Sequence, residues 1–265
     1  MSEPKTIDLT PPGPFASHST DLPRGGSMFL TFSNPKTQKS RKYGWATATL
    51  HLAPHMLSGI NVCPDASAGC IASCLNTSGC GGRFSHIQEA RVHKTLTVLH
   101  DRWTPSNAAL QRISEELHRF QRKCERAGMK PAVRLNATSD LPWEEWLRLT
   151  DFHTIQFYDY TKNMERMHRF IMNPDWPWNY YLTFSRSEKN THLTGAVLDA
   201  GGTVAVVTDV PKRQSFDEGW GEGRRVVDGR VHDLRFLDPP GAVVLLSALG
   251  HAKKDTSGFV LRRMP

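Results

Sequence analysis

The sequence predicts an α/β fold arranged as a complete or partial (β/α) barrel. Strand and helix patterns alternate from about residue 130 onward, and the strand segments are rich in β-branched and aromatic residues, as is typical of parallel sheets. At least six strands follow one another at this spacing, and a doubly wound open sheet is the alternative. No GxGxxG or GxxxxGK[ST] motif follows a strand, which weakens a nucleotide-binding interpretation.

The expected elements are short and are separated by polar turns. Strands are expected over 28–33, 45–50, 132–136, 155–160, 180–185, 203–208 and 242–247. Helices are expected from about residue 85, over 107–127, 143–151 and 164–172, with a helical or irregular stretch from 186 to about 200. Residues 1–27, rich in Pro, Gly, Ser and Thr, are expected to form a flexible arm, and 28–265 a single domain with a cysteine loop at 51–82.

Composition bounds the class of protein. The 265 residues suffice for one large domain, and a hydrophobic content of 38% allows a sizeable core. The mean hydropathy of −0.45, the short apolar runs and the lack of a signal-peptide pattern lead us to expect a cytoplasmic protein without membrane association. The net charge of +7 permits nucleic acid or a phosphorylated cofactor as a partner without requiring either.

Four of the five cysteines lie within 18 residues, in the loop NVCPDASAGCIASCLNTSGCGG. Cys63, Cys70, Cys74 and Cys80 are separated by six, three and five residues, whereas structural zinc sites use C-x2-C or C-x4-C pairs. A loop rich in small residues can wrap a cubane cluster, so a [4Fe–4S] cluster is the expected ligand. Zinc and free structural cysteines are the alternatives. Cys124 falls on the apolar face of a predicted helix and is expected to be a core residue.

Polar side chains follow the predicted strands, where parallel α/β folds gather their functional groups. The polar residues at 138–140, which follow the strand at 132–136, could instead cap the helix that begins near residue 142. The catalytic candidates are Asp159, Lys162 and Glu188, and the candidates for holding a cofactor or substrate are Asn136, Ser139 and Arg186.

Two further clusters stand near the C-terminus. The segment VVDGRVHDLRFLDPPG at 226–241 combines three acids, Asp228, Asp233 and Asp238, with His232, which suits either a divalent metal or a set of turn and ion-pair residues. His251, Lys253 and Lys254 follow the last strand and could meet a phosphate or carboxylate, or lie solvated.

The position of the cysteine loop, after a strand and before a helix, resembles that of the cluster loop in radical S-adenosylmethionine enzymes. Cys70 and Cys74 reproduce the C-x3-C step of those enzymes, whereas the C-x2-C step and the glycine-rich strand are absent. This resemblance implies an iron open to S-adenosylmethionine, with the strand-end groups holding cofactor or substrate. If all four cysteines are ligands, the open iron disappears and electron transfer becomes the expected role.

A second resemblance covers residues 28 to about 260. The segments FSNPKTQKS, NVCPDASAGCIASCLNTSG, VRLNATSD, FYDYTKN, YYLTFSRSE and VHDLRFLDPPGAVVLLSALGHAKKDTSGF are similar to bacteriophage proteins of the gene-product-88 type. The resemblance implies a viral origin, a host-cytoplasmic location and a ligand set of Cys63, Cys70 and Cys74. It leaves Cys80 undecided, because a basic residue often stands at that position.

Two functions follow from these observations. The first is an iron–sulfur protein that acts as a redox enzyme or as an enzyme similar to the radical S-adenosylmethionine enzymes. The second is a nucleic-acid-binding protein for phage replication or host takeover, with a structural cluster or zinc. It rests on the net charge and on a turn that carries basic groups beside aromatic ones: Lys36, Lys39, Arg41, Lys42, Tyr43 and Trp45. The sequence predicts neither a substrate nor an oligomeric state, and it leaves open whether the protein is an enzyme.

Overall fold

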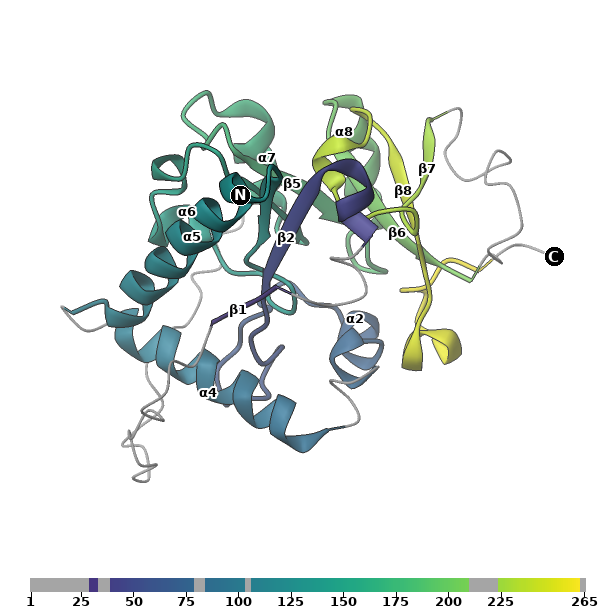
Figure 1. Cartoon of the computed structure of the whole chain (residues 1–265). Helices are drawn as coiled ribbons and strands as arrows, with labels where there is room; N and C mark the ends of the chain where they lie inside the picture. The colour runs from purple at the N-terminus through teal and green to yellow at the C-terminus, as the bar shows by residue number, and fades with distance from the viewer. Residues whose placement is uncertain (1–28, 33–38, 79–83, 103–105, 210–223, 263–265) are drawn as a thin grey trace.

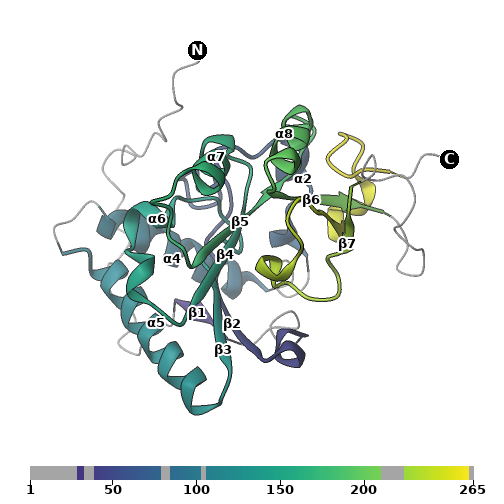
Figure 2. The same ribbon diagram turned by 90° about the horizontal axis from the view of Figure 1, so that it is seen from above.

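The computed structural model describes residues 29–32, 39–78, 84–102, 106–209 and 224–262. The expected arm at 1–27, together with Lys36 and Cys80, lies outside the described residues. Within them the fold is mixed α/β, with helices on the outer side of a curved, eight-stranded sheet (Figure 1, Figure 2).

The sheet is parallel except at one edge. The spatial order is β1-β2-β3-β4-β5-β6-β8-β7, and only β1 runs antiparallel to its neighbour. The strands are β1 (Leu30–Thr31), β2 (Trp45–Leu50), β3 (Lys130–Arg134), β4 (Gln156–Thr161), β5 (Tyr180–Ser185), β6 (Thr203–Thr208), β7 (Val226–Asp228) and β8 (Val243–Ser247).

The helices occupy the connections between strands. The α-helices are α2 (Ala68–Ala72), α4 (Ser85–Arg102), α5 (Ala108–Arg126), α6 (Trp143–Trp146), α7 (Met164–Met172) and α8 (Thr194–Asp199). The 3-10 turns are η1 (Arg41–Tyr43), η2 (Leu75–Thr77), η3 (Leu149–Asp151), η4 (Thr191–Leu193), η5 (Arg235–Leu237) and η6 (Gly250–Lys254).

These elements confirm the predicted α/β class with a largely parallel sheet. From β1 to β6 the spatial order follows the chain order, whereas a doubly wound sheet reverses its order at a switch point. A complete barrel is not formed, because β1 and β7 are both edges of the described sheet. The predicted helix over 143–151 is split into α6 and η3, since Leu147 adopts an extended conformation (φ −126°, ψ 134°). Neither β7 nor α2 was predicted.

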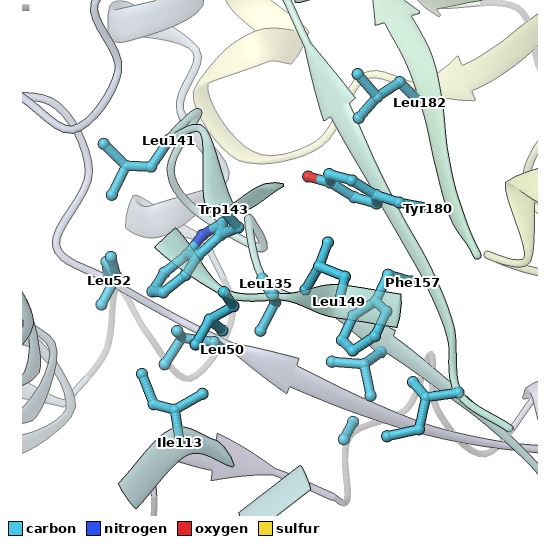
Figure 3. Close-up of a cluster of buried hydrophobic side chains, with 14 of the residues drawn as sticks. Leu50, Leu52, Ile113, Leu135, Leu141, Trp143, Leu149, Phe157, Tyr180 and Leu182 are labelled. Carbon is cyan, nitrogen blue, oxygen red and sulfur yellow. The ribbon is translucent and has the colours of Figure 1, made fainter. Parts of the chain in front are cut away.

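The main core lies between the outer face of the sheet and the helices. Figure 3 shows Leu50 of β2, Leu135 directly after β3 and Phe157 of β4 packed together with Trp143, which lies at the start of α6. Helix α5 contributes its buried face, on which Cys124 is 3% exposed, and this confirms Cys124 as a core residue. Each such apolar side chain contributes about 1.5–3 kcal/mol by burial.

The inner face of the curve is filled by residues 229–238, which we call the inner segment (Figure 2). The ring of Phe236 lies 4.8 Å from that of Trp45 and 5.5 Å from that of Tyr158. The Lys39 ammonium donates to the carbonyl of Arg230 (2.9 Å). The inner segment therefore reaches from the end of β7 to the beginning of β2, across the open side of the sheet.

Candidate metal centre

The cysteine loop lies at the carboxyl end of the sheet, with α2 and α4 below the strands in the view of Figure 1. Hydrogen bonds attach it to the connection that follows β3. The Asp140 amide donates to the carbonyl of Val62 (2.8 Å), and the Thr138 hydroxyl donates to that of Leu52 (2.5 Å). Two adjacent strands thus fix the loop at the end where parallel α/β folds place their functional groups.

The thiols of Cys63, Cys70 and Cys74 lie close enough to interact electrostatically. The pKa of Cys63 is raised to about 12, mainly by burial and in part by the negative charges of Asp140, Cys70 and Cys74, whereas a hydrogen bond from the His55 amide acts to lower it. Burial also raises the pKa of Cys74, whereas a hydrogen bond from the Asn76 amide acts to lower it. The structure therefore brings together the three cysteines that the sequence singled out.

Two cations face this group of thiols. Arg91 of α4 and Lys162, which follows β4, both lower the pKa of Cys74 through their positive charge. The Lys162 ammonium also donates to the Ser185 hydroxyl (2.8 Å) and lies 5.7 Å from the centre of the Phe259 ring. The sequence predicted a site role for Lys162 but none for Arg91, because nothing in the pattern of α4 distinguishes this arginine from a solvated one.

Glu188 fixes the turn that carries Cys70. Its carboxylate accepts hydrogen bonds from the Ser67 hydroxyl (2.7 Å) and the Gly69 amide (2.8 Å) at the start of α2. A Cβ on Gly69 would clash with the Ser257 hydroxyl and lie 2.7 Å from the Cβ of Phe259, so a larger residue does not fit there. The predicted catalytic residue Glu188 thus contacts the loop of the thiols and positions its backbone.

The three predicted cofactor-binding residues hold backbone turns. The Asn136 side-chain oxygen accepts from the Ser139 hydroxyl (2.7 Å), the Leu141 amide (2.9 Å) and the Trp143 indole (3.1 Å). The Arg186 guanidinium donates to the carbonyl of Phe259 (2.9 Å). These contacts place all three residues in the scaffold of the carboxyl end, where they support the loops around the thiols.

Asp159 lies apart from the thiols, in the interior. Its side chain is fully buried and accepts hydrogen bonds from the Asn136 amide (2.7 Å) and the Tyr180 hydroxyl (2.9 Å). Burial raises its pKa to about 7, against the opposing charges of Arg134 and Arg166. None of these interactions of Asp159, which the sequence predicted to be catalytic, involves the cysteine loop.

Folding stability is expected to fall between about pH 4 and pH 7 because of Asp159. The folded chain keeps the Asp159 proton up to about pH 7, whereas the ordinary value is 3.8. The proton therefore favours the folded state at low pH, and this advantage is lost as the pH rises through the folded value. Denaturant unfolding at several pH values should show the decline in the parent chain and a flatter profile in Asp159→Asn. Parallel profiles would contradict this assignment.

The acids at 228–238 are engaged in ion pairs. Asp228 pairs with Arg230 (2.6 Å), Asp233 with Arg134 (3.2 Å) and Asp238 with Arg235 (3.1 Å). This arrangement matches the ion-pair alternative for that segment. Throughout the described residues, no group of three or more His, Cys, Asp and Glu side chains is arranged to hold a single metal ion. His251, Lys253 and Lys254 are exposed in η6.

The chain was compared with known proteins. A family model described as Gene product 88 matches residues 28–263, which is most of the chain. No curated protein and no solved structure matches it. In the part of the chain that the structure describes, no helix has both the length and the apolarity needed to cross a membrane.

Proposed function

The chain belongs to the Gene product 88 family, a phage-type family, and from that premise we propose that it is an iron–sulfur protein. Cys63, Cys70 and Cys74 would hold a [4Fe–4S] cluster at the carboxyl end of the sheet, with Cys80 as a further candidate ligand. The observation that carries the proposal is the grouping of the first three thiols on one loop, where they interact electrostatically.

The chemistry of the donor set fits a cluster better than a single ion. A mononuclear site requires three or more side chains that converge on one ion, and no such group of His, Cys, Asp and Glu occurs among the described residues. In an iron–sulfur cluster each cysteine binds a different iron, so its ligands stand further apart. Arg91 and Lys162 would offset the negative charge of a thiolate-ligated cluster and tune its reduction potential.

The arrangement also suggests what such a cluster would do in the host cytoplasm. When bound, it supplies one-electron chemistry, and with three cysteine ligands it keeps one iron open to a small ligand such as S-adenosylmethionine. Glu188 would hold the backbone of α2 in place, and Lys162 would present a cation beside Cys74. The curved sheet, with its strands in chain order from β1 to β6, supports a partial (β/α) barrel of the kind expected from the sequence.

Anaerobic purification followed by iron and sulfide analysis tests the proposal. We expect about four iron and four sulfide ions per chain and a broad visible absorbance from sulfur-to-iron charge transfer. Electron paramagnetic resonance of the reduced protein, with and without S-adenosylmethionine, should show a signal that changes if the open iron binds this cofactor. A colourless protein that contains zinc, or no metal after cluster reconstitution, would refute the iron–sulfur assignment.

A further inference from the structure

An aromatic pocket lies at the amino end of the sheet, opposite the thiols. Its volume is about 420 Å³, within the range of sites that enclose small molecules or parts of larger ones. The walls come from the beginnings of β4 and β5, from the end of α7 and the loop that follows it, and from the inner segment. They include Gln156, Phe170, Trp176, Trp178, Tyr181 and Phe236.

Most aromatic rings of the pocket pack against one another. Trp176 stacks on Tyr180, with centroids 5.5 Å apart and planes 14° apart. Phe170 meets Trp176 and Tyr181 edge to face, at 5.9 and 5.2 Å. Trp178, by contrast, is 68% exposed at the rim. The pocket thus combines a fixed aromatic wall with one exposed indole on which a planar ring can stack.

The pocket wall also carries a hydrogen-bonding group. The side-chain amide nitrogen of Gln156 donates to the carbonyls of Phe157 (2.9 Å) and Asn179 (3.0 Å). These bonds fix the amide and leave its oxygen as an acceptor, which has no partner among the described residues. A planar ring with an N–H group on its edge, such as a nucleobase, matches this combination of stacking surface and acceptor.

Basic side chains lie beside the pocket at the same, amino end of the sheet. The pocket residue Phe236 contacts Trp45, and the Lys130 ammonium lies 5.6 Å from the centre of the Trp45 ring. Arg41 and Lys42 are exposed in η1, just before β2. The exposed carboxylate of Asp175 lies in the loop on the other side of the pocket, so phosphates are expected on the Lys130 side.

We propose that the amino end of the sheet binds single-stranded nucleic acid, with one base in the aromatic pocket and the adjoining phosphates along Lys130, Arg41 and Lys42. Aromatic stacking together with a basic track is the usual recognition mode for unpaired strands. The basic turn that the sequence singled out takes part through Arg41 and Lys42. The exposed Lys39 is instead bonded to the inner segment, and Trp45 packs under Lys130. The proposal is independent of the cluster, which lies at the other end of the strands.

Fluorescence anisotropy with labelled single-stranded oligonucleotides tests this surface. Trp178→Ala is expected to weaken binding about ten-fold by removing one stacking partner. Lys130→Ala should weaken it and lower the slope of log affinity against log salt by about 0.7, which is the value for one phosphate contact. Both side chains are exposed, so both variants should fold, as circular dichroism can verify.

Matched controls come from the opposite end of the sheet. Phe84→Ala removes a ring that is 44% exposed before α4, and Lys189→Ala removes an exposed cation in the turn after β5. Neither is expected to change binding. The proposal would be overturned by an absence of binding, by equal losses in controls and pocket variants, or by tighter binding of duplex than of single strand. A mononucleotide that binds as tightly as the oligonucleotide would assign the pocket to a small ligand instead.

Discussion

Serine in place of Cys63, Cys70 or Cys74 is expected to abolish cluster binding. A cluster with three cysteine ligands loses a bond to one of its irons in each variant, and the three thiols lie close enough to interact electrostatically. Iron content and visible absorbance after anaerobic purification should therefore fall to background in all three. Cys124→Ser is the matched control, because this thiol lies on the buried face of α5 and its loss should leave the iron content unchanged.

Cys80→Ala separates the two ligand models. If three cysteines hold the cluster, the variant keeps its iron and its response to S-adenosylmethionine. If all four are ligands, the variant should gain an open iron, which the resonance spectrum of the reduced protein would report. Full retention of iron in Cys63→Ser, Cys70→Ser and Cys74→Ser would contradict the site itself, provided that the thermal unfolding of these variants matches that of the parent chain.

Replacing Arg166 by alanine is expected to lower the free energy of unfolding by about 3–5 kcal/mol, as breaking a buried charge pair does. The guanidinium is 6% exposed and donates to Asp140 (2.7 Å), Glu144 (2.9 Å) and the Tyr180 hydroxyl (3.1 Å). Its removal leaves the Asp140 carboxylate without its ion-pair partner and the Glu144 carboxylate with Arg169 alone. Since Asp140 also accepts from the Lys162 amide (2.8 Å), the carboxyl end of the sheet should loosen as well.

Arg169→Ala provides the control on the same helix. Arg169 pairs with Glu144 (3.2 Å) and Glu145 (2.9 Å), but its side chain is 35% exposed, and exposed pairs contribute about 0–1 kcal/mol. Urea unfolding of both variants measures the difference. Similar losses in the two variants would show that burial of Arg166 adds nothing to the strength of its ion pairs.

The strands were predictable because their signal is local. The predicted ranges 45–50, 180–185 and 203–208 coincide with β2, β5 and β6, since β-branched and aromatic residues mark a buried strand wherever they cluster. The grouping of three cysteines was equally visible, because they lie on one short loop. What sequence reasoning missed depends on residues far apart in the chain, such as Glu188 bonded to Ser67.

The packing on the inner face of the curved sheet could not be predicted from the sequence either. Arg235 is fully buried there, although arginine in a run of charged residues usually indicates a solvated turn. The acids around it suggested a metal site or ion pairs, and only the fold shows that Asp233 pairs with Arg134 of β3. The aromatic pocket was missed for the same reason, because its walls come from three separate parts of the chain, at 156, 170–181 and 236.

The inner segment has a consequence for how the protein is made. Strands β1 to β6 stand in the sheet in the order in which a ribosome releases them, so each can pair with its predecessor during synthesis. Asp233, the partner of Arg134, emerges 99 residues after it. Until then the nascent sheet carries an uncovered inner face that includes Tyr158. The last quarter of the chain therefore completes the fold, and a chain cut short before it should be more sensitive to proteolysis than the whole chain.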